Sequence, residues 1–144
     1  MRVIGFSFGK INIERFKETS ESLKYNTKID ISNIEPLNSD FLKTKGEILK
    51  ISFVYSVTYD PEYAKLELAG SLLLSVEPRI AREILKSWKD KEISEDFRLF
   101  IFNVIIRKSN IKALQLEDDL GLPPHIPLPT LRKPEPKEES QPKQ

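Results

Sequence analysis

The segment from Gly46 to Val76 constrains this chain more than any other, because it indicates two long strands joined by a turn. From Lys50 to Tyr59, polar residues alternate with apolar ones that are mostly β-branched or aromatic. From Ala64 to Val76 the alternation returns, after the turn-forming Asp60-Pro61-Glu62. Alternation is typical of a strand with one buried face, and proline suits a turn because it fixes φ and has no N–H to donate. The segment therefore predicts a long antiparallel hairpin.

Two helices are expected after this hairpin. Pro78 favours a first helical turn, where its missing N–H would have had no partner, and apolar residues at helical spacing continue that helix to about Lys89. Ser94 is a suitable N-cap for a second helix, which continues to Leu120. Gly121 is placed to end this helix, because the residue just past a helix often adopts a left-handed conformation that glycine tolerates.

The remaining strand candidates lie upstream and are shorter. Residues Val3 to Phe8 and Lys28 to Ile31 are apolar enough to form strands, whereas residues 10–17 could extend a strand or open a loop. We therefore expect an α+β domain over residues 1–131: a four-stranded antiparallel sheet with a long central hairpin, backed by C-terminal helices. Residues 132–144 carry Lys, Glu and Pro with no apolar group to bury, which predicts a disordered tail.

Composition narrows the chemistry that the chain could perform. The 23 basic and 22 acidic side chains leave a net charge of +1. This balance argues against broad nucleic-acid binding, although the protein could meet nucleic acid as part of a larger assembly. The chain has no cysteine and one histidine, so neither a metal site nor a cysteine nucleophile is expected. We therefore expect no cofactor, no metal and no catalytic residue, as in a binding protein rather than an enzyme.

The sequence also favours a cytoplasmic location. No apolar stretch approaches the length of a membrane span, and residues 1–20 carry charges where a signal peptide would need an apolar run. We therefore expect no membrane insertion. Isoleucine, lysine and glutamate are frequent while cysteine, methionine and histidine are scarce, a bias that is mildly typical of a thermophile.

Three groups of residues have both a functional and a structural interpretation, and the structural one is preferred for each. His125 could be a pH-sensitive contact, but a surface or packing residue is the preferred interpretation. The acidic run Glu117 to Asp119 could recognise a cation or a partner, and a solvated helix end is preferred. Tyr55, Tyr59 and Tyr63 could stack on bases, but any half-buried strand shows such alternating aromatic residues, and a place in the core is preferred.

Apolar residues that one face of a sheet cannot cover supply the expected binding surface. From Phe97 to Ile106 the second helix is apolar almost all round, and such a helix is normally buried on most sides or packs in an oligomer. The Pro-rich run from Leu122 to Pro129 is apolar too, but it cannot be a helix interior or a central strand. It could strap over the helix or dock in the groove of a partner. A homo-oligomer or a permanent protein partner is therefore expected. The residues expected to contact protein are Leu99, Phe102, Ile106, Leu122, Ile126 and Leu128.

The order of these elements resembles the protein-export chaperone SecB and its SecB-like relatives. Residues Phe8 to Phe16 and Thr27 to Ile31 are similar to the first two strands of that family, and Ile51 to Val76 to its long hairpin. The apolar run Phe97 to Ile106 and the Leu-Pro-rich segment Gly121 to Pro129 resemble its helix and the exit from that helix. The resemblance implies a tetrameric holdase that binds unfolded chains in long apolar grooves.

Two functions of different classes follow from these features. The first is a SecB-like holdase or peptide-binding module, which binds unfolded or nascent chains through its apolar surface. The second is an accessory structural subunit of a large assembly, ribosome-associated or polymerase-associated, with the same fold. The near-neutral charge and the mixed-charge tail would suit a subunit that docks on protein as much as on RNA.

Overall fold

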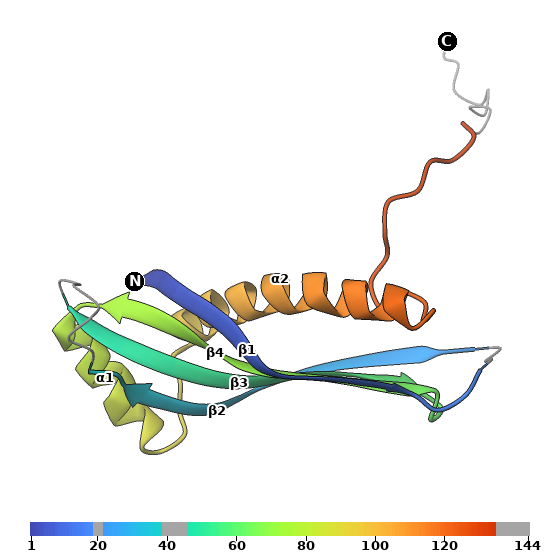
Figure 1. Ribbon diagram of the computed structural model, residues 1–144. Helices are drawn as coiled ribbons and strands as arrows, with labels where there is room; N and C mark the ends of the chain where they lie inside the picture. The colour runs from blue at the N-terminus through green and yellow to red at the C-terminus, as the bar shows by residue number, and fades with distance from the viewer. Residues whose placement is uncertain (19–21, 39–45, 135–144) are drawn as a thin grey trace, which may run out of the picture.

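The computed structural model describes residues 1–18, 22–38 and 46–134. The four strands form one antiparallel sheet in the order β1-β4-β3-β2. In Figure 1, α2 runs along the sheet, while α1 lies beside the end where β2 stops and β3 begins. The expected α+β class, with its long central hairpin and C-terminal helices, is confirmed; most of the expected tail lies outside the described residues. The elements are β1 (Arg2–Arg15), β2 (Lys24–Pro36), β3 (Glu47–Asp60), β4 (Ala64–Val76), α1 (Pro78–Trp88) and α2 (Glu95–Asp119).

The central hairpin of β3 and β4 builds most of the core. The two strands pair without a break from Glu47 opposite Val76 to Tyr59 opposite Ala64. On one face every second side chain is apolar and buried in the cluster shared with both helices, while the other face carries mainly small or polar side chains. The largest contributors from the two strands are Leu49, Ile51, Phe53, Tyr55, Tyr59, Leu66, Leu68, Leu72 and Leu74. The alternation in the sequence therefore predicted this core, including its tyrosines, correctly.

Bulges interrupt the alternation of side chains between the two faces of the sheet in the two outer strands. The pairing of β1 with β4 shifts register at Ile4 and again at Gly9, and the pairing of β2 with β3 shifts at Ser32. Each extra residue turns the side chains that follow to the opposite face, so apolar residues on both sides of a bulge can face the core. Strict alternation is lost as a result, which is why the sequence suggested only short strands here. The ambiguous residues 10–15 belong to β1.

β1 and β4 approach each other closely at Gly70. A Cβ atom on this residue would lie 3.0 Å from the Cα of Phe8 and closer still to the carbonyl oxygen of Ser7. Aromatic rings pack beside this contact: the ring centroids of Phe6 and Phe53 are 5.4 Å apart, and those of Phe6 and Phe8 are 5.2 Å apart. Such aromatic pairs add to the stability gained from area burial. The missing side chain at Gly70 thus allows the outer strand to dock on the hairpin.

α2 contacts the core through residues spaced four apart, namely Phe97, Ile101, Ile105, Ser109, Ala113 and Glu117. An α-helix turns about 100° per residue, so this spacing moves the buried line by about 40° at each step and by about 200° along the helix. The buried face therefore winds around α2 as the helix crosses a twisted sheet. Leu99 and Ile111 lie opposite the local contact line, and each is 55% exposed.

Both ends of α2 carry the capping residues expected from the sequence. The Ser94 hydroxyl accepts a hydrogen bond from a backbone N–H of the first turn. Beyond the last turn, Gly121 has a φ of +68° and Leu122 donates its N–H to the carbonyl oxygen of Glu117 at 2.8 Å, which is the arrangement of a Schellman motif. Arg15, at the end of β1, donates to the C-cap carbonyl oxygen at 2.8 Å. These contacts tie the end of α2 to the far edge of the sheet.

Replacement of Leu68 by Asp should destabilise the protein by about 4 kcal/mol or more, because it places an unpaired carboxylate on the buried face of a central strand. Lys65→Asp, on the solvent face of the same strand, is the matched control and should cost less than about 1 kcal/mol. Urea unfolding of both variants measures the difference. Equal losses would contradict the assignment of the two faces.

Candidate functional site

A groove of about 730 Å³ lies along β2. Its walls come from Ile29 to Ser32 of β2, from the loop between α1 and α2, and from the first turns of α2. The apolar part of the wall includes Trp88 at the end of α1, Ile93 in the loop and Phe102 of α2. The edge of β2 and the stretch from Trp88 to Phe102 therefore meet at one concave surface. Half of its lining is apolar, and the other half is polar or charged, from Asp30, Ser32, Lys91, Glu92 and Arg98.

β2 is an edge strand, and this sets the chemistry of the groove. In the sheet, β3 pairs with one side of β2, and no strand in the described part of the chain pairs with the other. An open strand edge presents N–H and C=O groups that can pair with an added strand from another chain. Alternate side chains of such a strand would point to the same side, toward Phe102 and Trp88. The groove thus combines backbone hydrogen-bonding groups with an apolar wall, which are the two requirements for binding an extended polypeptide.

α2 also presents apolar side chains to solvent. Leu99 and Ile106, which the sequence predicted to point away from the sheet, are 55% and 38% exposed. Phe102, predicted with them, is partly buried and contributes to the wall of the groove. On the other side of α2, Phe100 and Val104 border a second hollow of about 370 Å³. The exposed line of α2 therefore lies between two hollows.

The Pro-rich segment after α2 is held to the body only at its start. Leu122 is 5% exposed and belongs to the core, so the expectation that it forms part of an open binding surface is wrong. It is the hydrophobic contact that often accompanies a Schellman motif. Ile126 is partly buried, whereas Leu128 is 49% exposed and Leu131 is fully exposed. Residues 122–126, here called the strap, lie against the body, and residues 127–134 project away from it (Figure 1).

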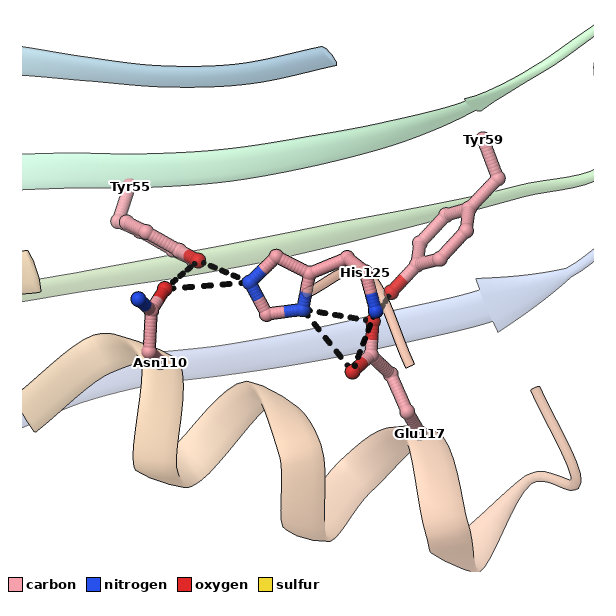
Figure 2. Close-up of polar contacts among 5 residues, drawn as sticks. All are labelled: Tyr55, Tyr59, Asn110, Glu117 and His125. Atoms are coloured by element: carbon pink, nitrogen blue, oxygen red, sulfur yellow. Dashed lines mark hydrogen bonds and ion pairs between the residues drawn. The ribbon is translucent and has the colours of Figure 1, made fainter. Parts of the chain in front are cut away.

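A buried polar network fixes the strap to α2 and β3 (Figure 2). The side chains of Glu117 and His125 are each 1% exposed. Nδ1 of His125 lies 3.0 Å from both carboxylate oxygens of Glu117, and the backbone N–H of His125 donates to the same carboxylate at 3.3 Å. The hydroxyl of Tyr59, on β3, donates to Oε2 of Glu117. One carboxylate therefore connects a helix, a strand and the strap.

The other ring nitrogen of His125 completes the network. Its Nε2 lies 2.9 Å from the hydroxyl oxygen of Tyr55 and 3.1 Å from Oδ1 of Asn110, and the Tyr55 hydroxyl donates to Oδ1 at 2.6 Å. The carboxylate oxygens of Glu117 act as acceptors here, which orients the imidazole with a proton on Nδ1. Nε2 is then an acceptor, and its one neighbouring donor is the Tyr55 hydroxyl, whose single proton can go either to Nε2 or to Oδ1 of Asn110.

The sequence interpretation of the acidic run was right for two residues and wrong for one. Asp118 and Asp119 are exposed, as expected of a solvated helix end, but Glu117 is buried. Glu117 lies four residues after the buried Ala113 and so continues the contact line of α2, a signal that the spacing alone could have supplied. The side chain of His125 is buried and hydrogen-bonded, so of the two preferred interpretations the packing residue is right and the surface residue is wrong.

The network is built to hold structure together. Burial raises the pKa of the Tyr55 and Tyr59 hydroxyls above their ordinary value of 10.0, and the neighbouring Glu117 adds to the rise. Both hydroxyls are therefore protonated donors at neutral pH. Within residues 1–18, 22–38 and 46–134, no group of three or more His, Asp or Glu side chains is placed to hold a metal ion.

Comparison with known proteins gives a likeness in structure but none in sequence. No protein-family model matches the sequence, and no curated protein matches it either. The chain is similar in structure to the Mycobacterium tuberculosis SecB-like chaperone Rv1957, solved in complex with a ChAD peptide from the Rv1956 HigA1 antitoxin. The likeness covers 93% of this chain and 92% of that chain, with 15% sequence identity and a TM-score of 0.47. At this level the likeness carries no argument about function. Neither helix in the described part of the chain is long and apolar enough to cross a membrane.

Replacement of Glu117 by Ala should destabilise the protein by about 3 kcal/mol, because it leaves the Tyr59 hydroxyl and two N–H groups of His125 buried without an acceptor. Asp118→Ala removes an exposed carboxylate from the same helical turn and should change stability by no more than about 0.5 kcal/mol. Urea unfolding of the two variants tests this. Similar small losses for both would show that the network does not hold the strap.

Alkaline pH should unfold the protein through Tyr55 and Tyr59. Their raised pKa values mean that the unfolded chain ionises them above about pH 10.0 while the folded chain keeps the protons. Their contribution to stability is therefore complete below that pH and is lost as the pH rises further. The free energy of unfolding, measured across this range, should fall less steeply in a Tyr55→Phe/Tyr59→Phe variant. Parallel curves for the variant and the natural chain would rule out these hydroxyls as the cause.

Proposed function

We propose that this protein is a peptide-binding module of the holdase type, which binds extended apolar segments of unfolded or nascent chains in the groove along β2. One observation carries the proposal: the open backbone edge of residues 29–32 and the apolar side chains of Trp88 and Phe102 face the same groove. A folded partner would seldom offer a free strand to such an edge. An unfolded chain offers one wherever its sequence is apolar.

Backbone groups and side chains have different roles in the groove, which explains how one site could accept many clients. Backbone hydrogen bonds are made equally by all residues except proline, so they supply affinity without selecting a sequence. The apolar wall then favours clients with large apolar side chains at alternate positions. Leu99 and Ile106 extend this apolar surface along α2 beyond the groove. In this proposal they make secondary contacts with longer clients.

The proposed activity is binding alone, in the cytoplasm, with no chemical step. An accessory subunit of a larger assembly would use the same exposed line of α2 for one permanent interface. The two functions differ in the partners recovered from cells. A holdase is recovered with many unfolded clients that vary with growth conditions, whereas a structural subunit is recovered with one fixed set of proteins at constant stoichiometry.

A client peptide should bind the intact chain, and Phe102→Ser should weaken that binding about tenfold, because it removes a large apolar side chain from the wall. The probe is a labelled peptide in which leucine alternates with serine and lysine, followed by fluorescence anisotropy. Ile111→Ser is the matched control, since it removes an exposed apolar side chain of α2 outside the groove. It should leave the affinity within about twofold.

The same two variants also test chaperone activity. The intact chain should suppress the aggregation of an unfolded client protein, measured by light scattering, and Phe102→Ser should lose most of this effect. The proposal would be contradicted if the intact chain failed to bind the peptide or to suppress aggregation. Equal weakening by Phe102→Ser and Ile111→Ser would move the binding site away from the groove.

A further inference from the structure

The hollow of about 370 Å³ beside α2, here called the β1 hollow, lies between the start of β1 and the middle of α2. It is separate from the groove along β2, because β1 and β2 are the two outer strands of the sheet. Three of its lining residues are apolar, two are cationic, and one carries an amide that can donate a hydrogen bond. They are Val3, Phe100, Asn103, Val104, Arg107 and Lys108.

The positive charge of the β1 hollow has no ion-pair partner in the described part of the chain. Neither Arg107 nor Lys108 forms an ion pair there. On a helix, an acidic partner would stand three or four residues away, and none of those positions is acidic for either residue. From Arg98 to Leu116, α2 carries four basic residues and no acidic one. The charge is therefore available to an anion.

Other hollows of the molecule carry acidic groups. The groove along β2 is lined by two basic and two acidic side chains. A hollow of about 240 Å³ between α1 and the start of α2 is lined by Glu83, Glu92 and Asp96. Carboxylates in both places would oppose the entry of an anion. The residues that line the β1 hollow include no carboxylate, so its charge favours an anionic ligand.

A fatty carboxylate matches both halves of this lining. A guanidinium group binds a carboxylate through paired N–H groups, and an ammonium group adds a second positive charge. An alkyl tail would lie on Val3, Phe100 and Val104, where burial of each methylene group adds affinity. The volume of about 370 Å³ falls within the range of roughly 300–1,000 Å³ that is typical of small-molecule sites. A membrane surface fits less well, since such surfaces are bound by clusters of about four to eight cations.

We propose that the β1 hollow binds a free fatty carboxylate, with Arg107 and Lys108 at the head group and the apolar residues along the tail. Asn103 supplies a further donor to a carboxylate oxygen. This site goes beyond the proposed function and does not depend on it, since the client groove lies on the other side of α2.

Tail length and head-group charge give the first test. Sodium octanoate and sodium decanoate, kept below the concentrations at which they form micelles, are titrated into the full chain by isothermal titration calorimetry. Decanoate should bind about tenfold more tightly, because each buried methylene group is worth about fourfold in affinity. Decyltrimethylammonium has the same tail length with a positive head group and should bind at least about tenfold more weakly than decanoate. Equal affinities for decanoate and decyltrimethylammonium would overturn the proposal.

Arg107→Gln/Lys108→Gln tests the head-group contacts. Both side chains are exposed, so the fold is expected to tolerate the change. The variant should bind decanoate about tenfold more weakly than the natural chain. Arg79→Gln/Arg82→Gln, the matched control, removes the same charge from α1 outside the hollow and should leave the affinity within about twofold. Equal losses in the two variants would show that decanoate responds to net charge alone, against the proposal.

Asn103 gives a signal from the site itself. Its side-chain amide resonance, observed by NMR on the isotope-labelled chain, should move when decanoate is added and stay in place with decyltrimethylammonium. A resonance that does not move at saturating decanoate would rule out this hollow as the site. Binding of the chain to phosphatidylglycerol vesicles, with no binding of free decanoate, would also overturn the proposal in favour of a membrane surface.

Client binding, measured on the same variants, keeps this inference separate from the proposed function. Arg107→Gln/Lys108→Gln should bind the labelled client peptide as the natural chain does, and Phe102→Ser should keep its affinity for decanoate within about twofold. A chain that binds the client peptide but not decanoate supports the holdase proposal and defeats this inference. A chain that binds decanoate but not the peptide supports the fatty-carboxylate site and defeats the holdase proposal.

Discussion

The Glu117 carboxylate lies in the last turn of α2 without solvent around it, and the C-terminal third of the fold depends on how that charge is satisfied. A helix C-terminus is unfavourable for an anion, and burial adds a desolvation cost. Three donors offset these terms: the Tyr59 hydroxyl from β3 and two N–H groups of His125 from the strap. Because each donor comes from a fixed position, the carboxylate sets the height of α2 over the sheet and the path of the chain that leaves it.

The other end of α2 obeys a different constraint, which explains the apolar surface. Contact positions four residues apart follow the twist of the sheet, so the buried line winds around the helix instead of following one side. Such a helix carries apolar residues around much of its circumference. At each turn, the apolar residues on the side away from the sheet face solvent. Leu99 and Ile106 are exposed for this reason. The binding surface proposed for the protein is thus a geometric consequence of placing a long helix across a twisted sheet.

Open strand edges are normally protected against pairing with other chains. β2 carries two such protections: a bulge at Ser32 and an exposed ion pair between Lys28 and Asp30, with 3.7 Å between the charged atoms. Neither closes the edge from residue 29 to 31, where the groove lies.

The amino-acid sequence by itself determined the central hairpin, both helices and their caps, because these depend on local patterns: alternation for strands, helical spacing, and Ser94 and Gly121 at the ends of α2. Bulges hid the full length of β1 and β2, since each extra residue interrupts the alternation that reveals a strand. Only the tertiary structure decided that Glu117 and His125 are partners and that Phe102 and Trp88 share a groove with the β2 edge. Glu117 and His125 lie on either side of the turn that ends α2, and β2 is far from Trp88 and Phe102 in the chain. Their meeting depends on the path of the chain after α2 and on the angle at which α2 crosses the sheet, which no local pattern encodes.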